Sequence, residues 1–413
     1  MKRKVFAIIA LMVAGEAVFL LAFVLPRVFR PTFLTVFHLT NFELGTAFSV
    51  YGVIAMFSYF LGGPIADRFS AKGLLIISLL LSSLAGLYLY AIPDDEGINL
   101  LYGFWGVSTI LLFWAAFIKV TRVYGGNTQG LAFGMIDSGR GFFAALLATG
   151  SIYVFSTFLP ADSSLVTEQD LTIALRAVIL IFTGFGCVSA GLIALALQGK
   201  EVEGVTQSSI SLPNLLAVMK KRSLWYQSLI VLCAYTGYKC TDDFSLYAVD
   251  VLGYDDVQAA TVGTISFWAR GVGAFLAGVL GDRFRMTRVL SICFVIMTVS
   301  SLLLSIKGVA SIPLIAIINL AVGSTAIYGL RGLYYSIFNI SNIPLALTGS
   351  AVGLVAVVGY TPEIFMGPLM GVVLDNNPGP AGHYYLFTIL ALFGIGGITA
   401  TFLFNREVTN TGN

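Results

Sequence analysis

Apolar stretches of about twenty residues or more, the length that a helix needs to cross the hydrocarbon core of a bilayer, alternate with short polar connections along nearly the whole chain. We therefore expect an all-α integral membrane protein with about twelve transmembrane helices. Pro26 and Pro31 should kink the first helix, because proline removes a backbone hydrogen bond. The predicted spans are 5–36, 42–66, 73–92, 98–122, 129–159, 171–197, 223–252, 257–281, 287–306, 311–338, 346–374 and 382–404.

The charged residues of the connections predict the orientation. Arg68, Lys72 and Lys220 follow spans that end on one side, whereas Asp94 and Asp255 lie in connections on the other side. An excess of Lys and Arg marks the cytoplasmic face. Both termini are therefore expected in the cytoplasm, and the protein is expected to be a multi-pass protein of the cell inner (plasma) membrane.

A polar segment near the midpoint divides the chain. We expect a cytoplasmic linker at 198–222 between an N-terminal six-helix half, 1–197, and a C-terminal six-helix half, 223–413. A short repeat supports this division, because GPIADRF at 63–69 recurs as GVLGDRF at 278–284, at the cytoplasmic end of the second helix of each half. Repeated six-helix halves are the architecture of one large class of transporters.

The repeated segment resembles the signature that follows the second helix in the major facilitator superfamily. The resemblance implies that fold and a gate between the halves, in which a carboxylate pairs with a neighbouring arginine and a helix N-terminus. A solvated loop turn is the alternative. The matching positions are Gly63, Asp67, Arg68 and Lys72 in the first copy and Gly278, Asp282 and Arg283 in the second. The late segment 367–371, followed by Asp375, is similar to a glycine-proline stretch of the family and suits helix packing or gating equally.

Composition excludes several classes of function. Only 11% of the 413 residues are charged and 57% are hydrophobic, whereas a soluble domain has about 25% charged residues. The net charge of +2 gives no reason to expect a nucleic-acid partner. The four cysteines lie in apolar runs without metal-ligand spacing, and two histidines are too few for a histidine metal centre. We expect no cofactor, no metal and no enzyme activity.

Ionisable residues at membrane depth are the main candidates for function, because each needs a cavity or a partner. Arg270 has no carboxylate nearby on its own helix, so we expect it to bind an anionic group of the solute through its planar guanidinium. The resemblance places most of these charges on helices that line the family's central cavity. The candidate solute-binding residues are Arg270, Lys239, Arg140, Tyr238, Trp268 and Tyr360. The candidate proton or ion-coupling residues are Glu16, Asp137, Asp242, Asp243 and Glu363.

Structural alternatives apply to most of these side chains. Asp137 and Arg140 stand three residues apart and Lys239 and Asp243 stand four apart, so each pair could neutralise itself on one helix face, leaving Asp242 to point elsewhere. The basic residues nearer the membrane surfaces could instead snorkel to headgroups. These are Arg331, Lys119 and Arg122 on the cytoplasmic side and Arg27 and Arg30 on the outer side.

The predicted function is secondary active transport of a small polar solute, anionic or zwitterionic, by alternating access. The segment 239–247 is similar to the seventh helix of the organic-anion and organophosphate branches of the superfamily, although Val24 stands where those branches have a basic residue on the first helix. Coupling to a proton or ion gradient, or to exchange, is expected. The expected partners are the solute, the coupling ion and membrane lipid, with the protein as a monomer.

Two other functions stay open at this point. A proton-driven exporter of amphiphilic compounds would carry a glycine-proline motif on the fifth helix, where Gly139-Arg140-Gly141 stands instead. A membrane-embedded enzyme would need a catalytic constellation, and a receptor usually adds a large soluble domain. The sequence offers neither.

Overall fold

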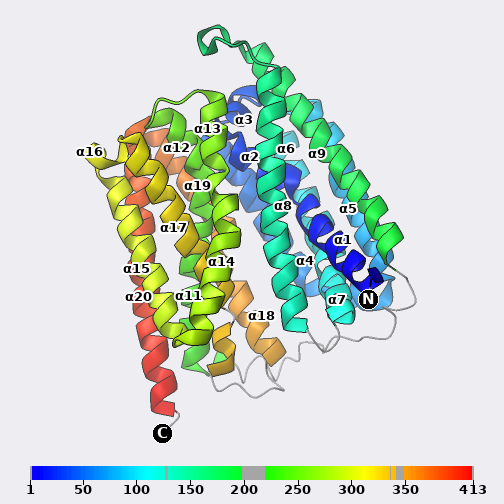
Figure 1. The fold of residues 1–413 in the computed structure, drawn as a ribbon, viewed down its shortest axis with the longest axis vertical. Helices are drawn as coiled ribbons and strands as arrows, with labels where there is room; N and C mark the ends of the chain where they lie inside the picture. The colour runs from blue at the N-terminus through cyan, green and yellow to red at the C-terminus, as the bar shows by residue number, and fades with distance from the viewer. Residues whose placement is uncertain (1, 126–128, 198–218, 335, 341–347, 412–413) are drawn as a thin grey trace.

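The computed structural model describes residues 2–125, 129–197, 219–334, 336–340 and 348–411, and within these ranges it is helical without a β-strand (Figure 1). The first half contains α1 (Lys2–Ala17), the π-helical turn η1 (Leu20–Val24), α2 (Leu25–Val28), α3 (Arg30–Val36), α4 (Asn41–Arg68), α5 (Ala71–Tyr90), α6 (Asp95–Gly106), the π-helical segment η2 (Val107–Trp114), α7 (Ala115–Gly125), α8 (Gln129–Thr157), the 3₁₀ turn η4 (Ser163–Leu165) and α9 (Glu168–Ala196).

The second half contains α11 (Arg222–Cys240), the 3₁₀ turn η6 (Thr241–Asp243), α12 (Phe244–Asp250), α13 (Asp256–Gly263), α14 (Ile265–Arg283), α15 (Met286–Ser305), α16 (Lys307–Ala310), α17 (Pro313–Leu333), the 3₁₀ turn η7 (Ser336–Ile340), α18 (Thr348–Gly359), α19 (Pro362–Asn376) and α20 (Pro380–Thr411). Most of the predicted linker, 198–218, lies outside the described residues.

The helices agree with the predicted spans. Over its described residues, each predicted interval falls on one helix or on a run of consecutive helices, to within a few residues at the ends. Within the described residues, nine helices are long and apolar enough to cross a membrane, or ten if the bent pair in the first span is one crossing. The all-α membrane fold is therefore confirmed, while the count of twelve crossings and the cytoplasmic position of the termini stay predictions.

The first span is broken earlier than its prolines predict. A bend of 43° lies between α1 and the run from Leu20 to Val28. Pro26 and Pro31 lie instead in the first turns of α2 and α3, where the missing proline N–H leaves no gap in the hydrogen bonding. Beyond the break, α2 lies against η6 and α13 of the second half.

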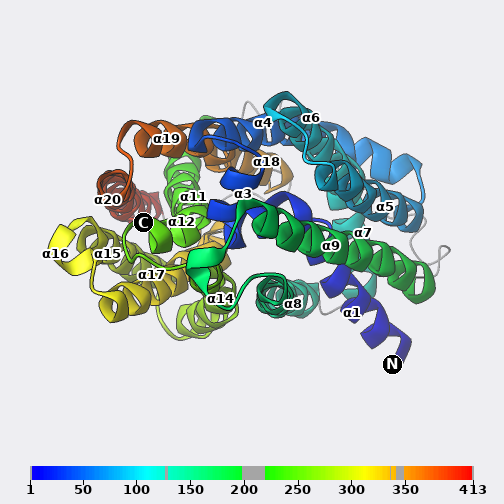
Figure 2. The same ribbon diagram turned by 90° about the horizontal axis from the view of Figure 1, so that it is seen from above.

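Two apolar cores hold the molecule together. The first consists of buried residues from Ala7 to Leu197, joined by two from the second half, Ala260 and Phe267. The second runs from Leu224 to Phe404. Viewed from above, α1–α9 and α11–α20 form two groups of helices side by side (Figure 2). The two groups of helices meet along a seam.

One end of this seam is closed by tight contact between α4 and α19. A Cβ atom on Gly45 would overlap the backbone of Gly367, and one on Gly371 would overlap the backbone of Phe42. Asp375 accepts backbone N–H bonds from Asn41 and Phe42, at 3.1 and 2.8 Å, and so caps the N-terminus of α4. The late glycine-proline segment therefore serves as a packing surface between the halves.

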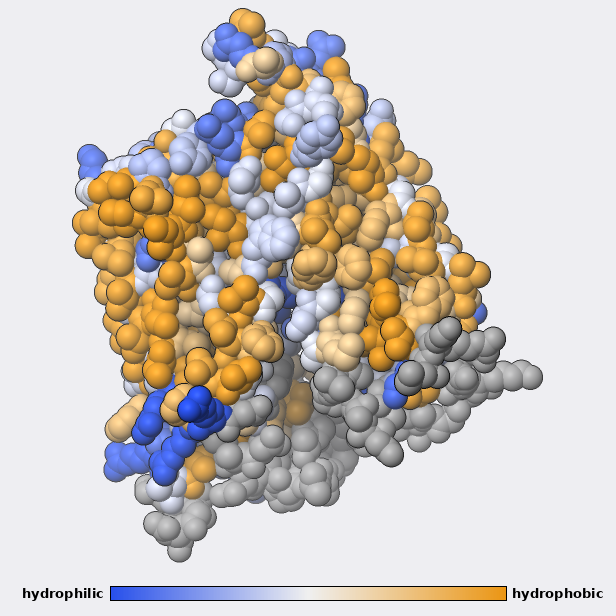
Figure 3. All heavy atoms as spheres, viewed as in Figure 1, coloured by the Kyte–Doolittle hydropathy of each residue, from blue (hydrophilic) through white to orange (hydrophobic). Residues whose placement is uncertain are grey.

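The outer face suits a lipid environment. Apolar side chains cover the flanks of both halves, and more polar residues follow the seam between them (Figure 3). Leu195, Phe275 and Phe402 are among the exposed large apolar side chains, with 79%, 67% and 64% of their surface accessible. Such exposure is costly in water and favourable in hydrocarbon.

Candidate functional site

A cavity of about 800 Å³ lies between the two halves. It extends from Glu363 to Arg122, which stands near the end of α7, so it reaches towards the end of the molecule where both termini lie (Figure 1). Five arginines and three carboxylates line it, together with aromatic side chains from both halves. The charged lining residues are Arg27, Arg122, Arg140, Arg270, Arg331, Glu16, Asp137 and Glu363.

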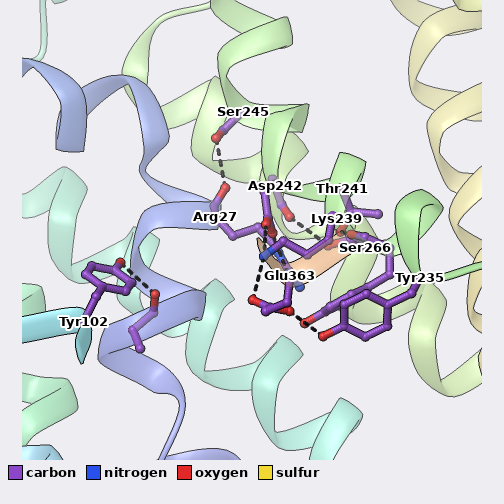
Figure 4. Close-up of polar contacts among 12 residues, drawn as sticks. Arg27, Tyr102, Tyr235, Lys239, Thr241, Asp242, Ser245, Ser266 and Glu363 are labelled. Carbon is purple, nitrogen blue, oxygen red and sulfur yellow. Dashed lines mark hydrogen bonds and ion pairs between the residues drawn. The ribbon is translucent and has the colours of Figure 1, made fainter. Parts of the chain in front are cut away.

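One wall of the cavity rests on a buried cluster of ion pairs, here called the central cluster: Arg27, Lys239, Asp242 and Glu363 (Figure 4). Arg27 from α2 reaches Asp242 on η6 at 2.5 Å. The Lys239 ammonium lies 3.0 Å from Asp242 and 3.1 Å from Glu363. Glu363 also accepts a hydrogen bond from the Tyr235 hydroxyl. Because two cations balance two carboxylates, all four side chains can stay buried.

The central cluster corrects two predictions from the sequence. Lys239 pairs with Asp242, three residues later, and not with Asp243. Lys239 lies in the last turn of α11, and the 3₁₀ turn η6 that follows places Asp242 beside it, whereas Asp243 contacts His383. Arg27 does not reach the outer interface, because its side chain is only 3% exposed and points inward. Arg30 is also buried, at 1%, and donates to the side-chain oxygen of Asn41 at 2.9 Å.

A second group of ion pairs, here called the bridging cluster, joins the halves: Glu16, Asp137, Arg140 and Arg270. Arg270 on α14 lies 2.8 Å from Asp137 and 3.3 Å from Glu16, both in the first half. Arg140 lies 3.4 Å from Glu16 and 3.8 Å from Asp137. The Asp137–Arg140 pair that the three-residue spacing predicts is therefore one of several contacts.

Glycines make room for the arginines of the bridging cluster. A Cβ atom on Gly141 would lie 3.0 Å from Cδ of Arg270, and one on Gly15 would lie 2.9 Å from Cδ of Arg140. Either would be tighter than an ordinary van der Waals contact. Gly141 thus lets the Arg270 side chain lie against α8.

The predicted solute-binding residues do not all face the cavity. Arg140, Arg270, Tyr238 and Tyr360 line it. Lys239 is 1% exposed and belongs to the central cluster behind the wall. Trp268 is 44% exposed, donates to the Thr149 hydroxyl at 3.3 Å and is not among the lining residues. Among the predicted coupling residues, Glu16, Asp137 and Glu363 line the cavity, whereas Asp242 and Asp243 do not.

Arg331 also differs from its predicted place. Its guanidinium does not extend to headgroups but lies over the ring of Tyr238, with 3.8 Å from Cζ to the ring centroid. Tyr235 and Tyr328 stand at 5.4 and 5.9 Å. In the part of the chain that the structure describes, no carboxylate pairs with Arg331. Lys119 is likewise buried, 2.9 Å from the Ala66 carbonyl oxygen, and does not snorkel.

The sequence signature at the end of α4 makes contacts within the first half. Asp67 lies 3.6 Å from the Lys119 ammonium on α7, and not against a neighbouring arginine as predicted. Lys72 donates to the carbonyl oxygens of Ala194 and Leu197 at 2.6 and 2.7 Å and so caps the C-terminus of α9.

The other signature residues make fewer contacts. A Cβ atom on Gly63 or Gly278 would meet nothing within 4 Å. The side chains of Arg68 and Arg283 are exposed. The side chain of Asp282 lies outside the described residues, so the second copy of the gate stays a prediction.

A buried histidine was missed by the sequence analysis. His383, at the start of α20, is 0% exposed, with Nδ1 2.7 Å from Asp243 and Nε2 2.9 Å from Asp250. Its place after a Pro-Gly-Pro segment is typical of a solvated loop, so its burial had no local signal. The contact does explain Asp243, which needs a cation once Lys239 pairs with Asp242.

Comparison with known proteins identifies the family of this chain. The sequence profile of the Major Facilitator Superfamily matches residues 5–361. The chain belongs to this superfamily. It is 27% identical to the inner membrane protein YqcE of Escherichia coli K12 over 89% of this chain and 87% of that protein. It is 24% identical to the inner membrane protein YihN of the same organism, over 90% and 89%.

Solved structures of two transporters share the fold of this protein. A mutant of the nucleoside transporter NupG superposes with a TM-score of 0.76 at 14% identity, over 98% of this chain and 99% of that one. A bacterial homolog of the human lysosomal transporter Spinster, inward-facing and unoccupied, gives 0.71 at 15%, over 99% and 98%. As a member of the Major Facilitator Superfamily with this fold, the protein is a membrane transporter and not an enzyme.

Proposed function

We propose that this protein is a secondary active transporter that carries a small anionic or zwitterionic organic solute across the inner membrane by alternating access. The single observation that carries the proposal is the cavity of about 800 Å³ between the halves, lined by five arginines and three carboxylates. A volume of this size accommodates a small organic molecule. The excess of arginine over carboxylate favours a solute with negative charge.

Alternating access needs a seam that can close at either end. The contact of α4 with α19 closes the end away from the termini, where Gly45 and Gly367 bring the backbones together. With the predicted orientation, the cavity is open to the cytoplasm in this conformation. In the opposite state the signature residues at the cytoplasmic helix ends, Asp67 among them, would close the other end.

Coupling to a proton gradient is best assigned to Glu363. This carboxylate lines the cavity, belongs to the central cluster, and stands in the first turn of α19, the helix that closes the seam. Its backbone also contacts Gly52 of α4, where an added Cβ would lie 2.9 Å away. Protonation of Glu363 would leave Lys239 to pair with Asp242 alone and so would change the balance that holds the seam.

The competing functions make different demands on the cavity. An exporter of amphiphilic compounds would be served by an apolar, cation-accepting cavity, whereas this one is rich in arginine. NupG, which has the same fold, is a nucleoside transporter, and nucleosides are uncharged compounds made of a base and a sugar. Neutral and cationic compounds therefore belong in the test as contrasting solutes.

Transport by the purified protein in proteoliposomes tests the proposal. Uptake and counterflow of labelled glucuronate, glycine, glucose, uridine and ethidium would be measured with and without an inward proton gradient. We expect accumulation of the anionic or zwitterionic solute, dependent on the gradient. Glu363→Gln should abolish accumulation and leave counterflow measurable, whereas Glu96→Gln, at an exposed helix start, should change neither. Transport of ethidium or uridine in place of the charged solutes would contradict the proposed solute class.

A further inference from the structure

Arg331 lines the cavity, and no carboxylate of the described residues forms an ion pair with it. Arg27 pairs with Asp242, and the arginines of the bridging cluster pair with Glu16 and Asp137. Arg122 is exposed at the mouth of the cavity, where water and headgroups can solvate it. Arg331 is half-buried on α17 with aromatic rings around it. A cation at this depth needs an anion, and the ring contacts supply only part of that need.

The Tyr328 hydroxyl, which lines the cavity near Arg331, is a second polar group without a partner among the described residues. The Tyr328 side chain stands one turn before Arg331 on α17 and is 3% exposed. In the described part of the chain, its hydroxyl makes no hydrogen bond. A buried hydroxyl without a partner costs about 1–3 kcal/mol. A ligand that forms a hydrogen bond with this hydroxyl would remove the cost.

The surrounding rings offer a surface for a flat or cyclic body. Tyr235 and Tyr238 have ring centroids 5.2 Å apart, and Tyr235 and Tyr360 have theirs 4.9 Å apart. Tyr238 meets Tyr328 edge-on at 6.1 Å. Stacking between rings and the apolar faces of sugars or aromatic groups suits such an array.

From this geometry we propose that Arg331 and Tyr328 bind the carboxylate of a ring-bearing organic acid, and that Tyr235, Tyr238 and Tyr360 hold its ring. The inference rests on the proposed function and names its solute class. One guanidinium balances one negative charge, so a carboxylate monoanion fits better than a phosphate dianion. The planar guanidinium can bind both carboxylate oxygens, and the phenol can donate a further hydrogen bond.

Binding to the detergent-purified protein tests the inference separately from transport. Glucuronate and benzoate would be titrated calorimetrically against their uncharged counterparts, glucose and benzyl alcohol. We expect saturable binding of at least one acid and none of its counterpart. Loss of a charge-assisted hydrogen bond, about 1.5–3 kcal/mol, means that Arg331→Gln should weaken affinity roughly ten- to a hundredfold. Arg331→Lys should recover part of the loss, and Tyr328→Phe should weaken affinity about two- to tenfold.

Arg176→Gln is the matched control. Arg176 also lies over a tyrosine ring, 5.0 Å from Tyr90, but on the surface away from the cavity. It should leave affinity unchanged. Since Arg331 pairs with no described carboxylate, Arg331→Gln should also keep its melting temperature, which shows that the fold is intact.

Three results would overturn the inference. These are unchanged affinity of the acid for Arg331→Gln, equal binding of acid and uncharged counterpart, and no saturable binding of either acid. Each is compatible with transport of another solute in proteoliposomes. The solute class can therefore fail while the proposed transporter function stands, and absence of all transport would refute the latter.

Discussion

Arg270 on α14 donates a hydrogen bond to Asp137 on α8, with 2.8 Å between Nη2 and Oδ1, and so links the two halves at the wall of the cavity. Its other neighbour, Glu16, lies at 3.3 Å. The two carboxylates differ in their surroundings, because the side chain of Asp137 is 57% exposed and that of Glu16 is 5% exposed. In this conformation the protein itself supplies the anion for Arg270. Solute binding by Arg270 would require these contacts to open.

The first prediction separates a structural from a solute-binding role of Arg270. Arg270→Gln should lower the melting temperature, because it leaves the buried Glu16 with Arg140 as its only cation among the described residues. Adding Glu16→Gln should restore much of the stability, whereas adding Asp137→Asn should restore less, since water already solvates that carboxylate. Melting in detergent and solute titration would be measured on all variants. Near-normal binding by the Arg270→Gln, Glu16→Gln protein would assign Arg270 to structure alone.

The second prediction concerns charge balance in the central cluster. Arg27→Gln leaves one cation, Lys239, with two buried carboxylates, which costs about 3–5 kcal/mol for a broken buried pair. Combination with Asp242→Asn should regain most of that loss. The free energy of unfolding, or the melting temperature in one detergent, measures it. Arg285→Gln, at an exposed position after α14, is the control for loss of an arginine. Equal destabilisation by the single and double variants would contradict the balance.

The sequence predicts the helices well because membrane spans follow from length and apolarity alone. It also indicates which helices carry buried charge, since each such residue is costly enough to need a reason. It does not predict pairing. Whether Lys239 meets Asp242 or Asp243 depends on the 3₁₀ turn η6, and no residue type in that segment demands such a turn.

Side-chain direction is the other property that the sequence does not predict. Arg331 and Arg27 stand near helix ends, where snorkelling to headgroups is the ordinary expectation. Their inward direction depends on neighbours that are distant in sequence, Tyr238 for both and Asp242 for Arg27. His383 is buried for the same reason, because its partners, Asp243 on η6 and Asp250 on α12, are distant from it in sequence.

The third prediction tests the seam between α4 and α19. Gly45→Ala should separate the helices, because the added Cβ overlaps the Gly367 backbone, and should shift the protein away from the conformation described here. Tyr51→Cys, a cavity position on α4, reports the change through its labelling by an impermeant thiol reagent from the side opposite the termini. Labelling should rise. Gly150→Ala on α8, where a Cβ meets nothing within 4 Å, is the control and should leave it unchanged. Identical labelling in both variants would show that the glycine contact does not hold the seam.

The last prediction distinguishes Asp243 from Glu363 as the site of proton coupling. Asp243 and His383 are both 0% exposed and do not line the cavity, so the pair has no direct route to the solute. Both ring nitrogens of His383 lie within 3 Å of a carboxylate oxygen, and a neutral imidazole has only one N–H to donate. His383, Asp243 and Asp250 therefore share one more proton than a neutral histidine with two ionised carboxylates would carry. His383 and Asp243 act as a buried ion pair.

His383→Leu should then destabilise the protein by about 3–5 kcal/mol, the cost of leaving a buried carboxylate without its partner. Adding Asp243→Asn should return part of that stability. Gradient-driven accumulation should persist in Asp243→Asn, measured per folded molecule, and should be lost in Glu363→Gln. Asp255→Asn is the control, because asparagine can still cap α13 in place of Asp255. Loss of accumulation in Asp243→Asn at an unchanged melting temperature would instead make the Asp243–His383 pair the coupling site, because a purely structural pair cannot lose coupling without losing stability.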